Sequence, residues 1–255
     1  KSFNKIINQL GYLKSRDLLN IENGIAIYND NKKKLFFDVV KTTDNLINNN
    51  LHASTLSLEF SANKEKIITN CGALENRFKK NPEYLRYSAA HSTIVINNTN
   101  ISELINKSSY KRTPKKIIYH NKQTEREIIL ECSHDGYFEN FGKIIKREIS
   151  ISKKENAISG KDTILSFKKN LQGQSFDIRF HLMSNCRCVL TNSKKSVLLK
   201  TSNNNSWIFE FNNIIRIEES ILIENGVNVK QNKQIVLSGF AKETKHVEKW
   251  LLRQI

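Results

Sequence analysis

Glycine, proline and cysteine are scarce in this sequence: 9, 2 and 4 of them in 255 residues. It contains no glycine-rich phosphate loop, no Gly-x-Ser-x-Gly elbow and no His-Glu-x-x-His pair. These absences exclude the common nucleotide-binding, α/β-hydrolase and zinc-protease patterns. The four cysteines form no Cys-x-x-Cys pair, which excludes zinc ribbons and thioredoxin-like redox motifs.

Acidic residues and long apolar runs are also in short supply. Lys and Arg number 41 against 25 Asp and Glu, so the formal net charge is +16. A surface this positive attracts polyanions, whether nucleic acid, anionic lipid or acidic polysaccharide. No apolar run approaches the roughly 20 residues that a membrane-spanning helix needs. A hydrophobic fraction of 38% is nevertheless enough for a substantial core.

Short β-branched stretches of alternating polarity dominate the chain. Because turn residues such as Asn, Asp and Gly separate them, they predict many antiparallel strands. Helical windows are rare, so the crossover helices that a parallel α/β fold requires are missing. We therefore predict an all-β fold, a large antiparallel β-sandwich. The predicted strands are 55–60, 92–97, 125–132, 143–151, 176–182, 196–200, 206–211, 214–224 and 233–240.

The N-terminal residues carry the one helix-like pattern. Phe3, Ile6, Ile7 and Leu10 follow the spacing of an amphipathic helix. We interpret residues 1–10 as a linker or the remnant of a preceding helical domain, and residues 11–255 as the sandwich domain. The chain does not begin with Met, so we expect it to be a piece of a longer protein.

Two histidines lie at the ends of predicted strands. His52 opens the strand that runs to residue 60, and His91 precedes the strand 92–97. Between them a third predicted strand ends in Asn70 and Cys71. If these strands are neighbours, two imidazoles and one oxygen or sulfur ligand could share a zinc ion. From the spacing alone, histidines that bond to backbone or water are the commoner outcome.

Other polar residues give weaker signals. His134 precedes an Asp-Gly pair that is equally good turn chemistry. The basic segment 107–116 contains Tyr110 and could contact phosphate or sulfate groups, although a solvated loop explains it as well. We interpret His120, His181 and His246 as structural.

Several segments of the chain together resemble a known family. The sequence is similar to the C-terminal β-domain of bacterial heparinase II/III-family proteins, and the resemblance covers nearly the whole chain. The run around His91 is its most specific piece. The matching segments are 52–59 (HASTLSLE), 68–72 (ITNCG), 86–93 (RYSAAHST), 133–137 (SHDGY), 180–182 (FHL) and 250–253 (WLLR).

The resemblance implies a two-part architecture and a reaction. Family members combine an α/α toroid with a β-sandwich, and only the second part is expected in this chain. They are polysaccharide lyases that cleave a uronic-acid-containing glycan by β-elimination. The implied partners are therefore an acidic polysaccharide and the toroid domain of the same parent chain. The family also implies a location in the periplasm or cell envelope.

The resemblance also assigns roles to single residues. His52 and His91 match the two zinc-ligand histidines of the family, and Asn70 stands where an aspartate ligand is usual. A neutral amide holds a dication less well than a carboxylate, so we expect a structural Zn²⁺ to be bound weakly, if at all.

Further departures bear on catalysis. Asn50 stands where family lyases often place a catalytic histidine, and an amide cannot act as a general base, although it can hydrogen-bond a substrate carboxylate. The catalytic tyrosine of the family belongs to the toroid. Arg86 is the expected partner of a substrate carboxylate, and His134 is a secondary candidate for proton transfer. The fragment alone is expected to be inactive.

Three functions remain open at this point. The leading prediction is the sandwich half of a lyase that acts on an acidic polysaccharide. The second is a non-catalytic glycan-binding or structural module, because Asn50 and Asn70 replace reactive residues. A nucleic-acid-binding protein is favoured by charge alone. No nucleic-acid partner is expected, because no recognised binding fold appears and the basic residues are dispersed.

Overall fold

The computed structural model describes residues 18–39, 52–74, 83–105, 109–167 and 173–255. These residues contain 19 strands and a single α-helical turn, α2 (Phe138–Phe141), which confirms the predicted all-β class. The predicted helix within residues 1–10 lies outside the described residues. Within them, no helix is long and apolar enough to cross a bilayer.

Two large antiparallel sheets form the body of the molecule. The nine-stranded sheet has the order β1-β2-β3-β4-β5-β13-β18-β17, with β6 also paired to β13. Its strands are β1 (Leu19–Glu22), β2 (Ile25–Asn29), β3 (Lys33–Asp38), β4 (Leu58–Ala62), β5 (Glu65–Thr69), β6 (Ile94–Ile96), β13 (Gln174–Leu182), β17 (Ile215–Glu224) and β18 (Asn228–Ala241).

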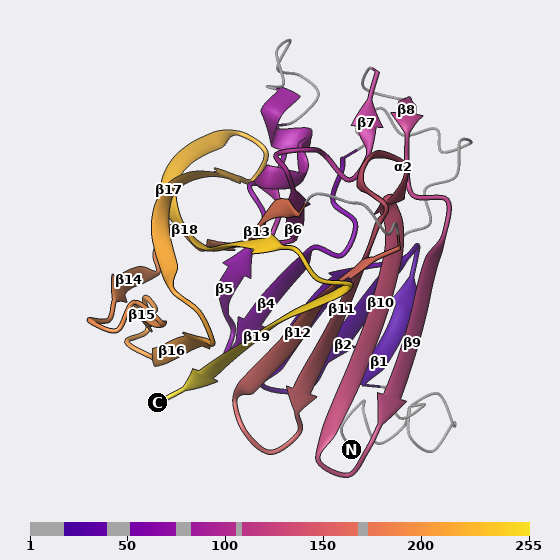
Figure 1. The fold of residues 1–255 in the computed structure, drawn as a ribbon. Helices are drawn as coiled ribbons and strands as arrows, with labels where there is room; N and C mark the ends of the chain where they lie inside the picture. Colours follow the sequence, from indigo (N-terminus) through magenta and orange to yellow (C-terminus); the bar gives the residue numbers. More distant parts are fainter. Residues whose placement is uncertain (1–17, 40–51, 75–82, 106–108, 168–172) are drawn as a thin grey trace, which may run out of the picture.

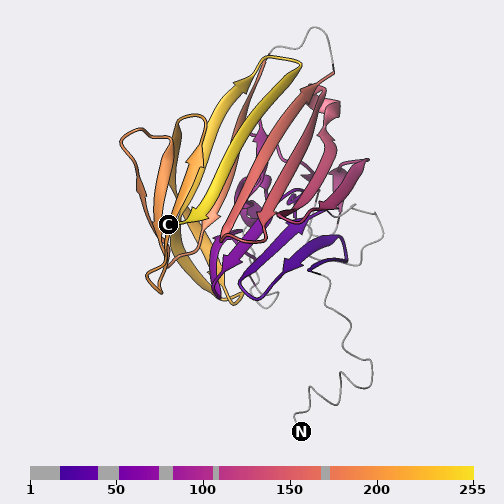
Figure 2. The same ribbon diagram turned by 90° about the horizontal axis from the view of Figure 1, so that it is seen from below.

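The second sheet has eight strands, in the order β14-β15-β16-β19-β12-β11-β10-β9. It faces the first sheet, and the two layers are seen edge-on in Figure 2. Its strands are β9 (Ile117–Gln123), β10 (Glu127–Tyr137), β11 (Lys143–Ser152), β12 (Ala157–Ser166), β14 (Arg187–Leu190), β15 (Ser196–Lys200), β16 (Ser206–Phe211) and β19 (Lys245–Gln254). The molecule is therefore a β-sandwich, as predicted.

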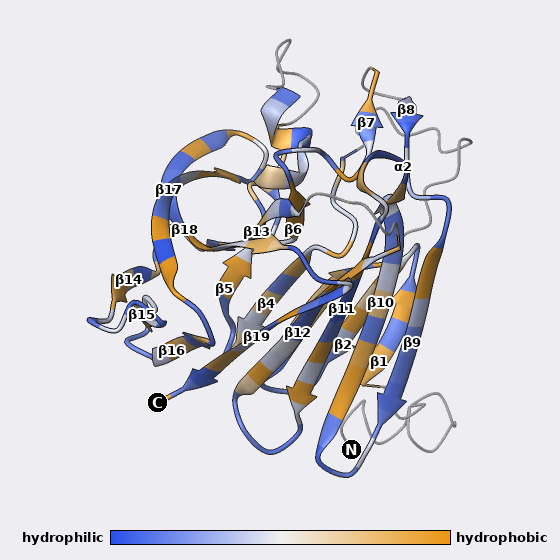
Figure 3. Ribbon diagram, in the orientation of Figure 1, coloured by the Kyte–Doolittle hydropathy of each residue, from blue (hydrophilic) through white to orange (hydrophobic). Residues whose placement is uncertain are grey.

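Alternating burial explains why these sequences form strands. Along β10 and β11 every second residue is buried between the sheets, as the pleat requires. The same alternation is visible as orange and blue bands along the strands in Figure 3. Aromatic rings from both layers meet in the core: Phe180 of one sheet lies 4.8 Å from Phe209 and 5.0 Å from Trp250 of the other, measured between ring centroids. This contact fastens the two sheets together.

Trp250 also depends on a glycine in the neighbouring strand. Gly160 pairs with Trp250 in the register of β12 and β19. A Cβ atom at position 160 would lie only 2.1 Å from the indole ring. The missing side chain thus lets the indole lie across β12, where its Nε1 donates to Asp162 at 3.1 Å.

A buried ion pair of the second sheet lies near one end of the sandwich. Arg147 of β11 and Asp162 of β12 are almost fully buried, and Arg147 Nε donates to Asp162 Oδ1 at 2.6 Å. The Arg147 guanidinium also donates to the carbonyls of Leu56 and Ser92, at 2.9 and 2.8 Å. Arg147 thereby fixes loops of the opposite sheet from inside the core.

The short elements outside the two large sheets lie at that same end, which we call the loop end. It carries the 3-10 helices η1 (Glu83–Arg86) and η2 (Ser88–Ala90), the small hairpin of β7 (Glu103–Leu104) and β8 (Tyr110–Arg112), and α2 (Figure 1). The sequence that forms η1 and η2 has no regular hydrophobic period. Their backbone instead closes short local hydrogen bonds, such as Ala90 N to the Tyr87 carbonyl at 2.9 Å.

Candidate functional site at the loop end

The structure brings His52 and His91 together. His52 precedes β4 and His91 follows η2, and the two residues come from segments 39 positions apart. His52 Nδ1 lies 3.3 Å from His91 Nε2, with ring centroids 5.3 Å apart. His91 is buried and His52 half-buried. The pair therefore borders solvent through His52 alone.

Both imidazoles are held in the neutral form. Burial lowers the pKa of His52 to about 4, the Arg86 charge adds to this, and a bond to the Leu85 carbonyl opposes it. Burial also lowers the pKa of His91, and the neighbouring His52 and His181 lower it further. Neutral imidazoles keep a ring nitrogen lone pair, which is what a metal ion or a proton donor needs.

Backbone and hydroxyl contacts fix the position of the pair. Tyr110 Oη of β8 donates to the His52 carbonyl at 2.9 Å. Next to it, Ala53 N donates to the Arg86 carbonyl at 2.9 Å, and Ser88 Oγ donates to the Ala53 carbonyl at 2.8 Å. Hydrogen bonds thus connect the segment that contains His52, the segment that leads to His91, and the strand β8.

Asn70, the third predicted ligand, is used within the framework. Its Oδ1 accepts the Ser92 backbone N–H at 2.8 Å, and its Nδ2 donates to Glu59 Oε1 at 3.2 Å. Its neighbour Cys71 lies beside His181 instead, as expected for adjacent residues that face opposite sides. Among the described residues, no three His, Cys, Asp or Glu side chains are grouped to hold a metal ion.

The two imidazoles fit a zinc ion better than the third ligand does. Two nitrogens bound to one tetrahedral zinc at 2.0–2.1 Å lie about 3.3 Å apart, which is the separation observed here. A direct hydrogen bond between neutral rings has a similar length, so the distance alone does not distinguish the two states. The amide of Asn70 supplies no negative charge, and the Ser92 N–H already occupies its oxygen.

Arg86 differs from its prediction. It was predicted to bind a substrate carboxylate, which requires access to its guanidinium, but it ends η1 with only 4% of its surface exposed. Burial lowers the pKa of Arg86, while Tyr110, Glu83 and Tyr87 oppose the shift. The segment forms 3-10 helices rather than a strand end, and this backbone buries Arg86. The charge nevertheless acts on His52.

His134 is not placed for proton transfer with a solvent-borne ligand. It lies inside β10 rather than in a turn after it, and only 1% of it is exposed. Its Nδ1 accepts the Gly136 N–H at 3.0 Å. Burial, followed by the charges of Arg147 and Arg112, lowers its pKa to about 3. These contacts are those of a structural histidine. Asn50, the other predicted contact with substrate, lies outside the described residues.

The sequence pattern missed a polar cluster beside the histidine pair. His181 of β13 lies with its Nδ1 2.8 Å from Ser220 Oγ and 3.6 Å from Cys71 Sγ. Its Nε2 lies 3.0 Å from the Ala89 carbonyl of η2. Strand alternation had assigned His181 a structural role, and its 1% exposure agrees with that role. The cluster joins β13, β17, η2 and the segment that follows β5, so no local spacing could have revealed it.

The chain is similar to known proteins in sequence and in structure. A sequence model of the heparinase II/III-like C-terminal domain family matches residues 19–251. No curated protein matches the chain. Heparan sulfate lyase HepC from Pedobacter heparinus is similar in structure, with a TM-score of 0.75 and 11% identity over 98% of this chain and 38% of that chain.

Two further solved structures are similar. A heparinase III gene product gives a TM-score of 0.74 at 8% identity, over 98% of this chain and 38% of that one. A crystal structure of heparinase III gives 0.66 at 16% identity, over 92% and 36%. At these identities the likeness establishes the fold alone. The chain spans little more than a third of the length of these proteins.

Proposed function

Because the chain belongs to the heparinase II/III-like C-terminal domain family, we propose that it is the β-sandwich half of a lyase that cleaves a uronic-acid-containing polysaccharide. The observation that carries the proposal is the neutral His52–His91 pair, 3.3 Å apart at the loop end. The net charge of +16 supports an anionic polymer as the substrate. An α/α toroid of the same parent chain supplies the other wall of the site.

The proposed reaction is β-elimination next to the uronate carboxylate. The C5–H and C4–O bonds break and a C4=C5 double bond forms, while the proton from C5 is balanced by one delivered to the leaving oxygen. The chemistry requires a neutralised carboxylate, a base at C5 and an acid at the leaving oxygen. In this chain Arg86 contributes positive potential beside His52. The catalytic base belongs to the toroid, so the 255-residue chain alone is inactive.

We propose that His52 and His91, with Asn70 as a weak third ligand, bind a structural zinc ion. The ion would fix both rings at the wall of the site. Asn70→Asp is the informative variant, since it adds the missing charge but also places a carboxylate beside Glu59. We therefore expect Asn70→Asp combined with Glu59→Gln to raise zinc affinity more than Asn70→Asp alone. Zinc titration with a competing chelator measures this. Equal affinity for native and double variant contradicts the proposal.

The lyase proposal is tested on the full-length protein with a panel of uronic-acid polysaccharides. Cleavage produces unsaturated uronate ends that absorb in the ultraviolet, which hydrolysis does not produce. His52→Gln should reduce turnover, whereas His120→Gln, at an exposed histidine of β9, should leave it unchanged. Absence of the chromophore across the panel refutes the lyase.

A non-catalytic glycan-binding module is the second candidate. It is favoured by the neutral residue at position 70, whose side chain is fully used within the fold. Such a module binds acidic polysaccharides in a salt-dependent manner and forms no unsaturated product. Binding without product in the assay above would establish it. Either function agrees with the periplasmic or cell-envelope location that we propose from the family.

A further inference from the structure

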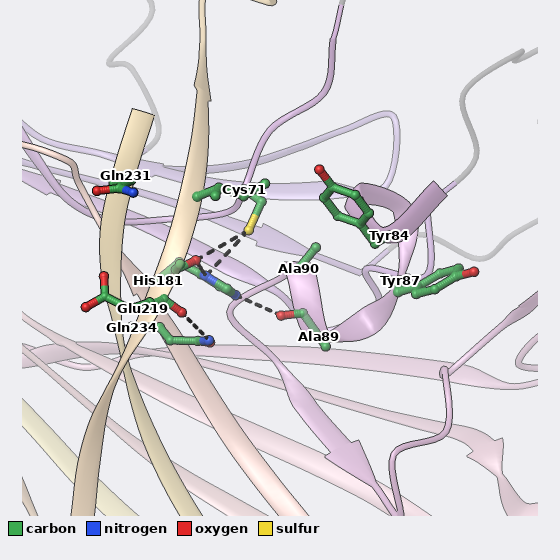
Figure 4. Close-up of a pocket in the computed structure, with 11 residues that line it drawn as sticks. Cys71, Tyr84, Tyr87, Ala89, Ala90, His181, Glu219, Gln231 and Gln234 are labelled. Atoms are coloured by element: carbon green, nitrogen blue, oxygen red, sulfur yellow. Dashed lines mark hydrogen bonds between the residues drawn. The ribbon is translucent and has the colours of Figure 1, made fainter. Parts of the chain in front are cut away.

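A second feature of the loop end is a cavity of about 640 Å³. It lies between the 3-10 segment on one side and the strands β17 and β18 on the other (Figure 4). Its size is within the range of roughly 300–1,000 Å³ typical of small-molecule sites. Ala90 and His181 line it; His91 follows Ala90 in the chain, and His181 acts electrostatically on His91.

The two walls of the cavity differ in chemistry. Tyr84 and Tyr87 form the wall on the side of the 3-10 segment and are 55% and 39% exposed. Two glutamines, Gln231 and Gln234, and the carboxylate Glu219 form the opposite wall. An aromatic face opposite planar amides and a carboxylate suits a ligand with apolar C–H faces and hydroxyl edges.

Hydrogen bonds hold the side chains at the floor of the cavity in place. His181 and Cys71 are buried there and contact each other and Ser220. The Gln234 side chain is held as well, since Arg179 donates to its Oε1 at 3.3 Å and its Nε2 donates to the Glu219 carbonyl at 3.3 Å. Gln231 is exposed at the opening. Its amide is placed to bond a ligand rather than the floor.

Among the residues that the structure describes, the lining contains no Lys or Arg. Burial lowers the pKa of His181 to about 4, so its ring is neutral. The remaining charged group is Glu219, whose ion-pair partner Lys233 of β18 is outside the lining. A carboxylate or sulfate placed in the cavity would therefore meet Glu219 with no cation from the lining to balance it.

We propose that this cavity binds one uncharged pyranose ring, stacked on Tyr84 or Tyr87 and hydrogen-bonded by Gln231 and Glu219. That the ligand is a saccharide rests on the proposed function.

Matched sugars test the charge selection. The probes are methyl β-glucopyranoside with methyl β-glucuronopyranoside, and the corresponding galactoside pair, which differ only in a CH₂OH group against a carboxylate. Saturation-transfer NMR on the 255-residue chain should detect a neutral member and give a weaker signal, or none, for its acidic counterpart. Equal or stronger binding of the acidic members, or no binding of any neutral one, overturns the inference.

Variants place the binding in the cavity. Tyr84→Ala should weaken binding about three- to tenfold, the usual effect of losing an aromatic contact. Phe138→Ala is the control, because Phe138 is 40% exposed in α2, outside the cavity lining. Gln231→Lys should instead strengthen binding of the glucuronoside. Neutral-sugar binding that Tyr84→Ala and Gln231→Lys leave unchanged would refute the site.

The outcomes separate this inference from the function on which it rests. Cleavage of acidic glycans by the full-length protein without neutral-sugar binding in the cavity removes the inference and leaves the lyase. Neutral-sugar binding that depends on Tyr84, in a protein that neither cleaves nor binds acidic glycans, removes the proposed function and leaves the sugar site.

Discussion

Replacing Arg147 tests how the two sheets are held together. Arg147→Met keeps most of the aliphatic volume and removes the guanidinium. Asp162, almost fully buried, would then keep the Trp250 indole as its side-chain donor. The carbonyls of Leu56 and Ser92 would each lose a charged donor. The variant therefore leaves Asp162 without its cationic partner and the Leu56 carbonyl without the guanidinium, while the Ser92 carbonyl keeps the Leu58 N–H at 3.3 Å.

These losses set the expected magnitude. Removing one member of a buried ion pair costs about 3–5 kcal/mol, because the remaining charge stays desolvated. The lost bond to the Leu56 carbonyl adds to this cost. The second substitution Asp162→Leu in the same chain should recover a large part of the loss, since replacing a whole buried pair by apolar groups is often close to neutral.

Urea unfolding of the 255-residue chain measures these free energies. The matched control is Arg253→Met, because Arg253 Nε binds Glu210 Oε2 at 3.0 Å in a pair of which 44% and 38% remain exposed. That exposed pair should contribute less than about 1 kcal/mol. If Arg147→Met costs no more than Arg253→Met, the pair is solvated and the reasoning is wrong.

Two other predictions concern stability. Gly160→Ala should destabilise the chain by about 1–3 kcal/mol, because its Cβ collides with the Trp250 indole; an unchanged urea midpoint contradicts this. Stability should fall as pH drops from about 6.5 toward 4. Burial lowers the pKa of His134 and His181 in the folded chain, so in this range the unfolded chain binds more protons than the folded one. Burial opposes ionisation of Glu65, but four hydrogen bonds outweigh it and lower its pKa to about 2. Its stabilisation, about 3 kcal/mol when ionised, is therefore lost only below about pH 4.5, and Glu65→Gln should remove that acidic part of the profile.

The sandwich could be predicted from the sequence because its information is local. In β10 and β11 the buried positions are those that alternation assigns to the core. Asn and Gly residues also indicated turns. Asn225 and Gly226 adopt φ of 53° and 70° in the turn between β17 and β18, a conformation that these two residue types favour. Short-range periodicity and turn residues were thus sufficient to predict the all-β class and most of the strands.

The polar residues of the interior could not be predicted in the same way. Alternation treats a charged residue as outward-facing, yet Arg86, His134 and Arg147 are all buried. Their partners are distant in sequence: Arg147 donates to carbonyls 55 and 91 positions away. The His52–His91 pair was expected from the family resemblance, because spacing alone favoured unconnected histidines. Long-range partners are invisible to a local pattern.

Ser92 shows how the core and the candidate site depend on each other. Its N–H binds Asn70, its hydroxyl donates to the Thr69 carbonyl at 2.6 Å and accepts the His181 N–H at 2.9 Å, and its carbonyl accepts from Arg147. These bonds come from β5, β13 and β11, so three strands determine where the residue after His91 lies. Asn70 can serve this junction as an amide or as a carboxylate, because the Ser92 N–H needs only one oxygen. Its bond to Glu59, however, needs the amide N–H. Asn70 therefore weakens the proposed metal site, but its amide N–H is what the neighbouring Glu59 carboxylate requires.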